Sequence, residues 1–314
     1  MADLSQSLMV SAPAKLNLGL SVTTRRGDGF HEIETIMARI DLADSVEVTL
    51  VRVDRAAGTT SLPPGHEPVL DAGRQVSLKV VGPDLLTQAV PVDATNLVVK
   101  AAEGYLRLLG QDVTDGLHVH IELTKRVPVA AGLGGGSSDA AATLMALTRL
   151  LPAAIDVPAL GLALGSDVPF FLTPWPAALA RGRGERLSAI EVPAVDLVVV
   201  KPTFGVSAAE AYSLLAGFTP RLRAADIVTA LAAGEEPGWR NALQPGVIRA
   251  YPEVRSVLAA LKGAGLTGCI MSGSGSACFG VARSRAEAED RAASIAAAAR
   301  EAASGWLVLP ASVA

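Results

Sequence analysis

Residues 130–141 read AAGLGGGSSDAA, and an alanine-rich, helix-forming run follows the glycines at once. Glycine permits positive φ angles and removes the Cβ atoms that would block a close ligand. Successive backbone N–H groups, together with the start of the next helix, favour an anion. The segment therefore has three interpretations: an ordinary loop, a dinucleotide-binding turn or a cradle for a phosphate chain.

Two common phosphate motifs fit this segment poorly. No Lys closes it, so it is not a loop of the form GxxxxGK[ST]. The stretch from Gly132 approximates GxGxxG, but Ser137 stands where the last glycine belongs, and the preceding strands look antiparallel. A dinucleotide-binding oxidoreductase is therefore the weaker alternative.

Composition bounds the class of protein. The chain has 314 residues, half of them hydrophobic, and a formal net charge of −4. This length and apolar content suit one or two domains with a buried core. The net charge is not the strongly basic one expected of a general nucleic-acid binder. The two cysteines, Cys269 and Cys278, have neither zinc-site spacing nor the density of a disulfide scaffold. The N-terminus lacks a signal-peptide pattern and the apolar runs are short. We expect a cytoplasmic protein without nucleic-acid or membrane partners.

Hydrophobic periodicity predicts a mixture of strands and helices, hence an α+β class. Segment 8–22 is predicted to be a strand pair or one bent strand, and 54–75 a surface excursion. Further strands are expected at 44–51, 75–82, 117–123, 196–202, 269–282 (two strands around a turn) and 306–311. Helices are expected at 96–110, 137–151, 207–215, 253–265 and 285–305.

Other residues could carry chemistry, and each also has a structural interpretation. Lys15 and Asn17 would share one face of a strand, although a surface Lys has the same pattern. The turn RRGDGFHE (25–32) presents Phe30 and His31, which suit either base stacking or the core. Asp167 precedes Val168-Pro169 and is predicted to lie where a helix ends and a strand begins, as a base or as a turn residue. MSGSGSACF (271–279) is either a plain hairpin or a second loop that closes on a ligand.

Three of these stretches together resemble the GHMP kinase superfamily: PAKLNL (13–18), GLGGGSSDAA (132–141) and MSGSGSACF (271–279). RRGDGFHEIETI (25–36) and LGSDVPFF (164–171) resemble the members that phosphorylate 4-diphosphocytidyl-2-C-methyl-D-erythritol on the non-mevalonate route to isoprenoids. The similarity runs through most of the chain and fades around 54–92 and in the alanine-rich tail.

The resemblance implies a two-domain fold, with a nucleotide-binding domain at 1–172 and a ferredoxin-like α/β sandwich at 173–314. It implies transfer of the γ-phosphoryl group of ATP, with Mg²⁺, to the 2-hydroxyl of a small cytidyl diphosphate substrate. Asp167 would be the catalytic base, and Lys15 would polarise the acceptor hydroxyl. The implied ATP-binding residues are Pro128, Val129, Ala130, Ala131, Gly132, Leu133, Gly134, Gly135, Gly136, Ser137 and Ser138.

The resemblance also implies the substrate contacts. Asn17 would place the acceptor, Phe30 and Tyr212 would cover the two faces of the cytosine, and His31 would bond its edge. Ser138 is the candidate Mg²⁺ ligand, and the chain is expected to be a monomer or homodimer. Asp139 is interpreted as a helix-start stabiliser.

Two departures from the family pattern stand out, and rival functions remain. Phe30 replaces a common Tyr, and Ala242 stands where the family often has Asp. A GHMP kinase for mevalonate, homoserine or a sugar is the nearest rival, although such substrates have no use for a base-stacking turn. A non-catalytic nucleotide-binding module is disfavoured because Lys15 and Asp167 are both present.

Overall fold

The structure, a computed structural model, describes residues 6–54, 59–60 and 75–313. The chain forms two compact units that interleave in sequence. The first unit comprises Met1–Ala12, Ala43–Val127 and Gly135–Pro174, and the second comprises Pro13–Leu42, Pro128–Gly134 and Trp175–Ala314. They interleave because the long strands β1 (Gln6–Arg25) and β2 (His31–Asp54) contribute residues to both. The predicted domains 1–172 and 173–314 stay a prediction, with their boundary near the Pro174/Trp175 crossing.

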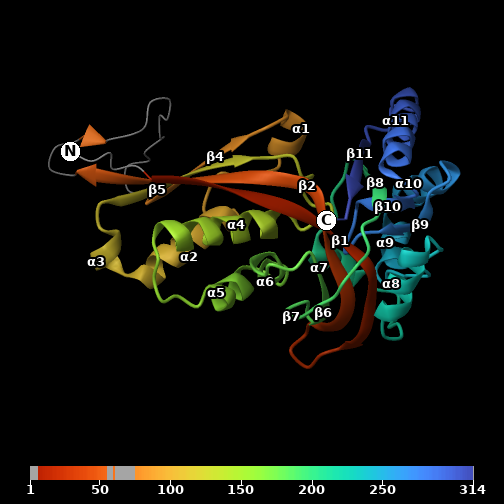
Figure 1. The fold of residues 1–314 in the computed structure, drawn as a ribbon, viewed down its shortest axis with the longest axis horizontal. Helices are drawn as coiled ribbons and strands as arrows, with labels where there is room; N and C mark the ends of the chain where they lie inside the picture. Colours follow the sequence, from red (N-terminus) through yellow and green to blue (C-terminus); the bar gives the residue numbers. More distant parts are fainter. Residues whose placement is uncertain (1–5, 55–58, 61–74, 314) are drawn as a thin grey trace. The chain divides into compact units, whose positions relative to one another are not determined.

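In the first unit, β5 (Leu117–Thr124) lies between β2 and β4 (Val76–Val81). It pairs antiparallel with β2 and parallel with β4. Helices α2 (Leu97–Leu109) and α4 (Gly135–Leu150) pack together on one face of these strands (Figure 1). The remaining elements of the unit are β3 (Thr59–Thr60), α1 (Asp84–Thr87), α3 (Gln111–Thr114), α5 (Val157–Leu164) and α6 (Val168–Leu172).

Local sequence signals account for the two long helices of this unit. The Asn96 side chain caps α2 by accepting from the Val98 N–H at 2.9 Å, and Gly110 ends the helix. Tyr105 of α2 is buried and donates its hydroxyl to the Leu151 carbonyl at 2.8 Å, just beyond α4. The facing part of α4 is rich in buried alanines, which allow close helix packing.

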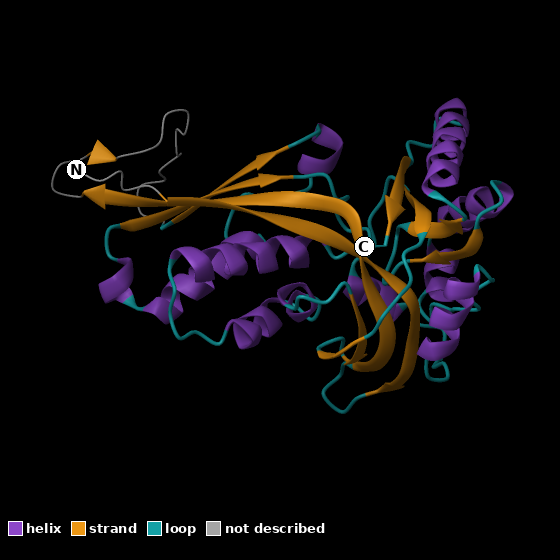
Figure 2. Ribbon diagram, in the orientation of Figure 1, coloured by secondary structure: helices purple, strands orange, loops and turns teal. Residues whose placement is uncertain are grey.

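The second unit contains a four-stranded antiparallel sheet in the order β11-β8-β10-β9. The chain order of its core elements, strand–helix–strand–strand–helix–strand, is that of a ferredoxin-like fold, which confirms the predicted α/β sandwich. Its strands and helices are β8 (Asp196–Lys201), α10 (Glu253–Gly263), β9 (Thr267–Met271), β10 (Cys278–Ala282), α11 (Arg285–Glu301) and β11 (Leu307–Ser312). Figure 2 shows α10 and α11 on one face of the sheet, where they cover Val198 and Val200.

The rest of the second unit surrounds the paired parts of β1 and β2. Strand β6 pairs antiparallel with β2 from Ile33↔Gly182 to Ala38↔Ala177, and β7 follows it. The elements are β6 (Ala177–Gly182), β7 (Arg186–Ala189), α7 (Ala208–Ser213), α8 (Ala224–Ala233) and α9 (Gln244–Ala250). Ser207 caps α7 by accepting from the Glu210 N–H at 3.1 Å, at the start of the helix expected at 207–215.

Four expectations need correction or closer definition. Segment 8–22 is part of one long strand. The pattern of KRVPVAAG (125–132) favours a continuation of the strand at 117–123 into the glycine run, and this is wrong, because the strand ends at Thr124. The strand expected after Asp167 is wrong: the short helix α6 begins at Val168, because proline is tolerated in the first turn of a helix. The predicted excursion at 54–75 lies almost wholly outside the described residues.

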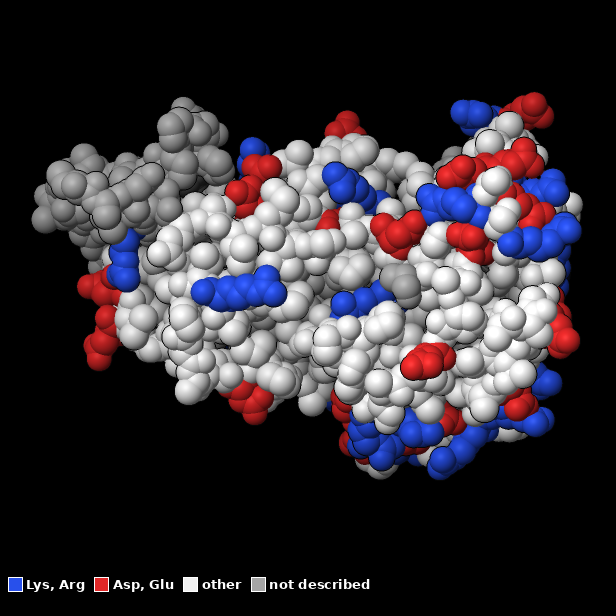
Figure 3. Space-filling view, in the orientation of Figure 1, with Lys and Arg blue, Asp and Glu red and all other residues white. Residues whose placement is uncertain are grey.

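Within the described residues, none of the helices combines the length and the apolar character needed to cross a membrane. On the face drawn in Figure 3, acidic and basic side chains are interspersed, most densely over α11 and at the β1–β2 hairpin. Both cysteines are free thiols.

Candidate active site

The second unit holds Lys15 beside the glycine-rich segment. Lys15 and Asn17 are both buried on β1. The Lys15 ammonium donates to Asn17 Oδ1 at 2.5 Å and to the Gly132 carbonyl at 2.9 Å. The Asn17 amide donates to Thr35 Oγ1 on β2 at 3.0 Å, which fixes the direction of its oxygen. The structure therefore joins two predicted site residues to a loop 117 positions from Lys15.

Packing within the protein explains some of the glycines in this loop. Gly132 and Gly134 have φ angles of 73° and 71°, and even Ala130 has a φ of 50°. A Cβ on Gly132 would lie 2.2 Å from the Ser272 carbonyl oxygen. Ser272 Oγ in turn donates to the Gly132 carbonyl at 3.1 Å. Glycine at 132 is thus required by the neighbouring turn, a reason that the sequence did not reveal.

That neighbouring turn joins β9 and β10 and approaches the buried lysine. A Cβ on Gly273 would lie 2.6 Å from Asn17 Oδ1 and 3.4 Å from the Lys15 ammonium. Asn241, a residue not predicted from the sequence, holds the turn by donating to the carbonyls of Met271 at 2.8 Å and Gly273 at 2.7 Å. The hairpin is therefore built against Lys15 and Asn17, while any contact of it with ligand stays a prediction.

Ala242 follows Asn241 and is buried in the hydrophobic core of this unit. An aspartate at this position would bring a carboxylate into apolar surroundings. The side-chain hydrogen bonds from this segment to the β9–β10 turn are made by Asn241.

In the first unit, the start of α4 offers unpaired polar groups. The first N–H groups of a helix have no partner within the helix, so Gly135, Gly136 and Ser137 present donors. The Ser138 hydroxyl is buried and has no hydrogen-bond partner among the described residues. Donors and an orphaned hydroxyl at a helix start fit a phosphate chain with a bound cation. The described residues contain no group of three or more His, Cys, Asp or Glu side chains that could hold a metal by themselves.

Asp139 has a role that the sequence analysis missed. It lies buried in an ion-pair cluster, where the Lys125 ammonium binds Asp139 Oδ2 at 2.9 Å and also Asp44. Asp44 Oδ1 accepts from the backbone N–H groups of Arg126 and of Val127, the latter at 2.8 Å. Burial raises the pKa of Asp139 to about 7, against the opposing effect of Lys125. The sequence signal for this ion pair was a Lys just before the glycine run and an Asp just after it.

Asp167 occupies the position just before the short helix α6 in the first unit and is half-buried. Its side chain makes no capping hydrogen bond to that helix. It belongs to a different unit from Lys15, so the cooperation of the two stays a prediction.

The β1–β2 hairpin carries the predicted base-binding residues. Phe30 is half exposed, and the guanidinium of Arg183 lies over its ring, 4.4 Å from the centroid. The rings of His31 and Tyr212 stack on each other with centroids 5.0 Å apart and an interplanar angle of 15°. One face of the Tyr212 ring is thus in contact with His31, and the expectation that Phe30 and Tyr212 cover the two faces of a base stays a prediction.

Partial burial and the nearby Arg25 charge lower the pKa of His31 below its usual value. This shift favours the neutral imidazole, which has one nitrogen to donate and one to accept. Such a ring suits the mixed donor and acceptor edge of a cytosine.

Comparison with known proteins gives consistent matches along the chain. The N-terminal domain of GHMP kinases matches residues 96–173, and the C-terminal domain matches 222–302. A protein of Deinococcus radiodurans named 4-diphosphocytidyl-2-C-methyl-D-erythritol kinase is 42% identical over 310 residues, which cover 96% of this chain and 92% of that protein. A Thermus thermophilus protein of the same name is 42% identical and covers 86% of each chain.

Solved structures agree. A crystal structure of 4-(cytidine 5'-diphospho)-2C-methyl-D-erythritol kinase superposes with a TM-score of 0.76 and 38% identity, covering 97% of this chain and 98% of the other. A homoserine kinase from Cytophaga hutchinsonii has a TM-score of 0.67 and 19% identity, covers 99% of this chain and 95% of its own, and shares the fold alone.

Proposed function

Since the chain belongs to the 4-diphosphocytidyl-2-C-methyl-D-erythritol kinases of the GHMP kinase family, we propose how its residues carry out the transfer. The enzyme transfers the γ-phosphoryl group of ATP to the 2-hydroxyl of 4-diphosphocytidyl-2-C-methyl-D-erythritol. One observation supports placing the reaction at this site: the buried Lys15 ammonium is held between Asn17 Oδ1 and the Gly132 carbonyl.

The proposed place of the ATP phosphates is the loop from Pro128 to Ser138. The N–H groups at the start of α4 and the partial positive charge of that helix favour a phosphate chain there. The orphaned Ser138 hydroxyl would be the protein group that holds Mg²⁺. When bound, Mg²⁺ neutralises phosphate charge.

Asp167 is the proposed base. It takes the proton of the 2-hydroxyl as that oxygen bonds to the γ-phosphorus, while the bond from phosphorus to the β–γ bridging oxygen breaks and ADP leaves. The Lys15 ammonium stabilises the negative charge on the reacting oxygens, and Asn17 holds that ammonium in place. Positioning and charge stabilisation supply most of such a rate enhancement.

The cytosine is proposed to stack on Phe30, with the neutral His31 bonding its edge and Tyr212 supporting His31 from behind. Phe30 supplies stacking without the phenolic hydroxyl of the common Tyr. Mevalonate, homoserine and sugars have no group that could use this platform, which makes a kinase for them the weaker candidate. Because the chain belongs to a kinase family, the oxidoreductase alternative is abandoned.

A coupled assay tests the substrate. Purified protein is given ATP and Mg²⁺ with, in separate reactions, the cytidyl-erythritol substrate, mevalonate, homoserine and galactose. We expect phosphorylation of the first alone. Turnover of another acceptor at a comparable rate, or none of the cytidyl substrate, would refute the assignment.

The relatives act on a small molecule, and the finer partner statements remain our proposals. We propose a cytoplasmic monomer or homodimer that needs no nucleic-acid or membrane partner. Sedimentation of the purified chain and fractionation of cells test these statements.

A further inference from the structure

Arg183 stands out at the hairpin because of what its guanidinium contacts. It belongs to the turn between β6 and β7, and its guanidinium carbon lies 4.4 Å from the centre of the Phe30 ring. Such a cation over an aromatic face is attracted by the ring quadrupole. One face of Phe30 is thus covered from a segment more than 150 positions away in sequence.

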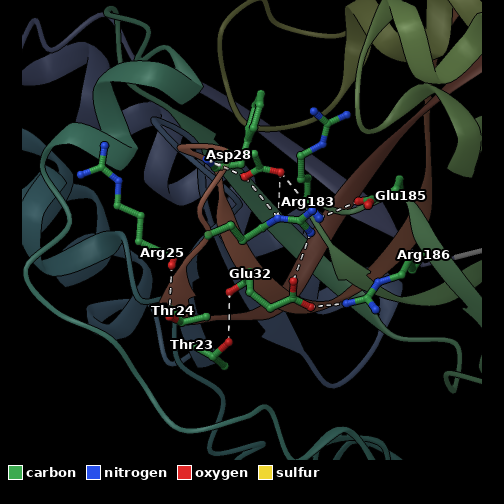
Figure 4. A network of polar contacts seen from close by, with 10 residues as sticks. Thr23, Thr24, Arg25, Asp28, Glu32, Arg183, Glu185 and Arg186 are labelled. Carbon is green, nitrogen blue, oxygen red and sulfur yellow. Dashed lines mark hydrogen bonds and ion pairs between the residues drawn. The ribbon is translucent and has the colours of Figure 1, made fainter.

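The carboxylates around Arg183 are held by other groups. Arg26 pairs with Asp28 at 3.0 Å and with Glu32 at 3.3 Å, and Arg186 also binds Glu32. Figure 4 shows this network, with Arg25 pointing away from it.

Glu185 accepts from the backbone N–H of Arg183 at 2.5 Å, which fixes the turn. This hydrogen bond uses the backbone of Arg183 and not its guanidinium. Within the described part of the chain, no carboxylate lies within ion-pair distance of the Arg183 guanidinium, although its charge acts on Asp28 from farther away, and the Phe30 ring is its close contact.

The backbone of Phe30 is already fixed by its own hairpin. Its N–H donates to Asp28 Oδ1 at 3.1 Å, and its carbonyl accepts from the Arg26 N–H at 2.7 Å. The side chain is nevertheless 50% exposed. Since Arg183 lies on one face, the exposed area belongs to the opposite face and the edge of the ring.

We propose that Arg183 is a positioning residue for the base: it holds the Phe30 ring so that the opposite face is ready to stack on cytosine. This inference rests on the proposed function. An exposed aromatic side chain would otherwise lose rotamer freedom on binding, and that loss weakens affinity. The expected arrangement is a stack of guanidinium, phenyl ring and base.

The test compares Arg183→Ala with wild type in two measurements, steady-state kinetics and titration with cytidine 5′-diphosphate. We expect the KM for the cytidyl substrate and the Kd for cytidine diphosphate to rise about two- to fivefold, which is the factor for an exposed cation–π contact. The kcat and the KM for ATP stay unchanged. Arg183→Lys, which keeps a cation, recovers part of the loss.

Two further variants separate positioning from general structure and from direct contact. Arg186→Ala, at the start of β7 and three residues from Arg183, removes the ion pair with Glu32 and leaves the Arg183–Phe30 contact in place, so it should leave both constants unchanged. In a Phe30→Ala background, Arg183→Ala should have no additional effect.

An unchanged KM in Arg183→Ala, or an equal rise with and without Phe30, overturns the inference. A wild type that binds cytidine diphosphate but fails to phosphorylate the cytidyl substrate overturns the proposed function instead.

Discussion

The Lys125 ammonium lies 2.9 Å from Asp139 Oδ2, and each side chain is only 3% exposed. Lys125 precedes the glycine-rich loop and Asp139 follows it, so this buried pair joins the two ends of the segment proposed to hold ATP. Asp44 completes the cluster from β2 and also binds the backbone at Arg126 and Val127. One ammonium therefore faces two buried carboxylates and cannot compensate both charges. Burial, with the Asp44 charge nearby, accordingly raises the pKa of Asp139.

Removal of the cation should be strongly destabilising. Lys125→Met leaves two buried carboxylates without their partner, so we expect a loss of about 3–5 kcal/mol in the free energy of unfolding. Urea titration measures it. Lys79→Met is the matched control, because Lys79 pairs with Glu122 at the same 2.9 Å but is 61% exposed, and its loss should be about 1 kcal/mol or less. Equal effects of the two variants would contradict the structural role of the cluster.

The same cluster predicts a pH dependence of stability. The pKa of Asp139 is raised by burial from 3.8 to about 7, so between these values the folded protein holds a proton that the unfolded chain has released. This contribution is complete below about pH 4 and is lost as the pH rises through 7. Asp139→Asn should lack it.

Urea titrations of both proteins at pH 5 and pH 8 check the sign. The stability advantage of wild type over Asp139→Asn should be larger at pH 5. A difference that is constant or grows with pH would show that Asp139 is ionised in the folded state.

The base assignment predicts a specific kinetic defect. Asp167→Asn cannot accept the proton of the acceptor hydroxyl, so we expect turnover to fall by a factor of about 10² to 10⁴. Binding of ATP, followed with a fluorescent nucleotide, should be almost unchanged. Asp156→Asn alters an exposed helix cap in the same unit and should turn over normally. Near-normal turnover of Asp167→Asn would remove Asp167 from the reaction.

Glycine at 132 predicts a steric effect. Gly132→Ala places a Cβ 2.2 Å from the Ser272 carbonyl at a φ of 73°, so the loop has to move and both stability and ATP affinity should fall. Gly263→Ala is the control, because a Cβ there would meet nothing within 4 Å at the end of α10, where alanine is favoured. Thermal melts with and without ATP compare them. An unperturbed Gly132→Ala would show that the two loops separate freely.

Local patterns predicted most elements because their causes are local. The period-two run at 117–123 and the Asn96 cap with Gly110 needed no distant residue to be recognised. The strand expected after Asp167 failed, because the preference of a residue before proline was outweighed by the tolerance of proline in a first helical turn.

The family and its reaction also came from the sequence, since long motifs keep their order in one dimension. The sequence by itself determined that Lys15, the glycine run, the hairpin turn and Asp167 are the parts to examine. It also determined the α+β class with a ferredoxin-like second half.

Only the tertiary structure decided which residues meet. It set Asn17 and Gly132 around the Lys15 ammonium, closed Lys125 on Asp139, and laid Arg183 over Phe30. Each of these contacts joins a strand or loop to a partner fixed by strand pairing and core packing. Sequence spacing carries no information about such partners, because the free energy that brings them together is spread over the whole fold.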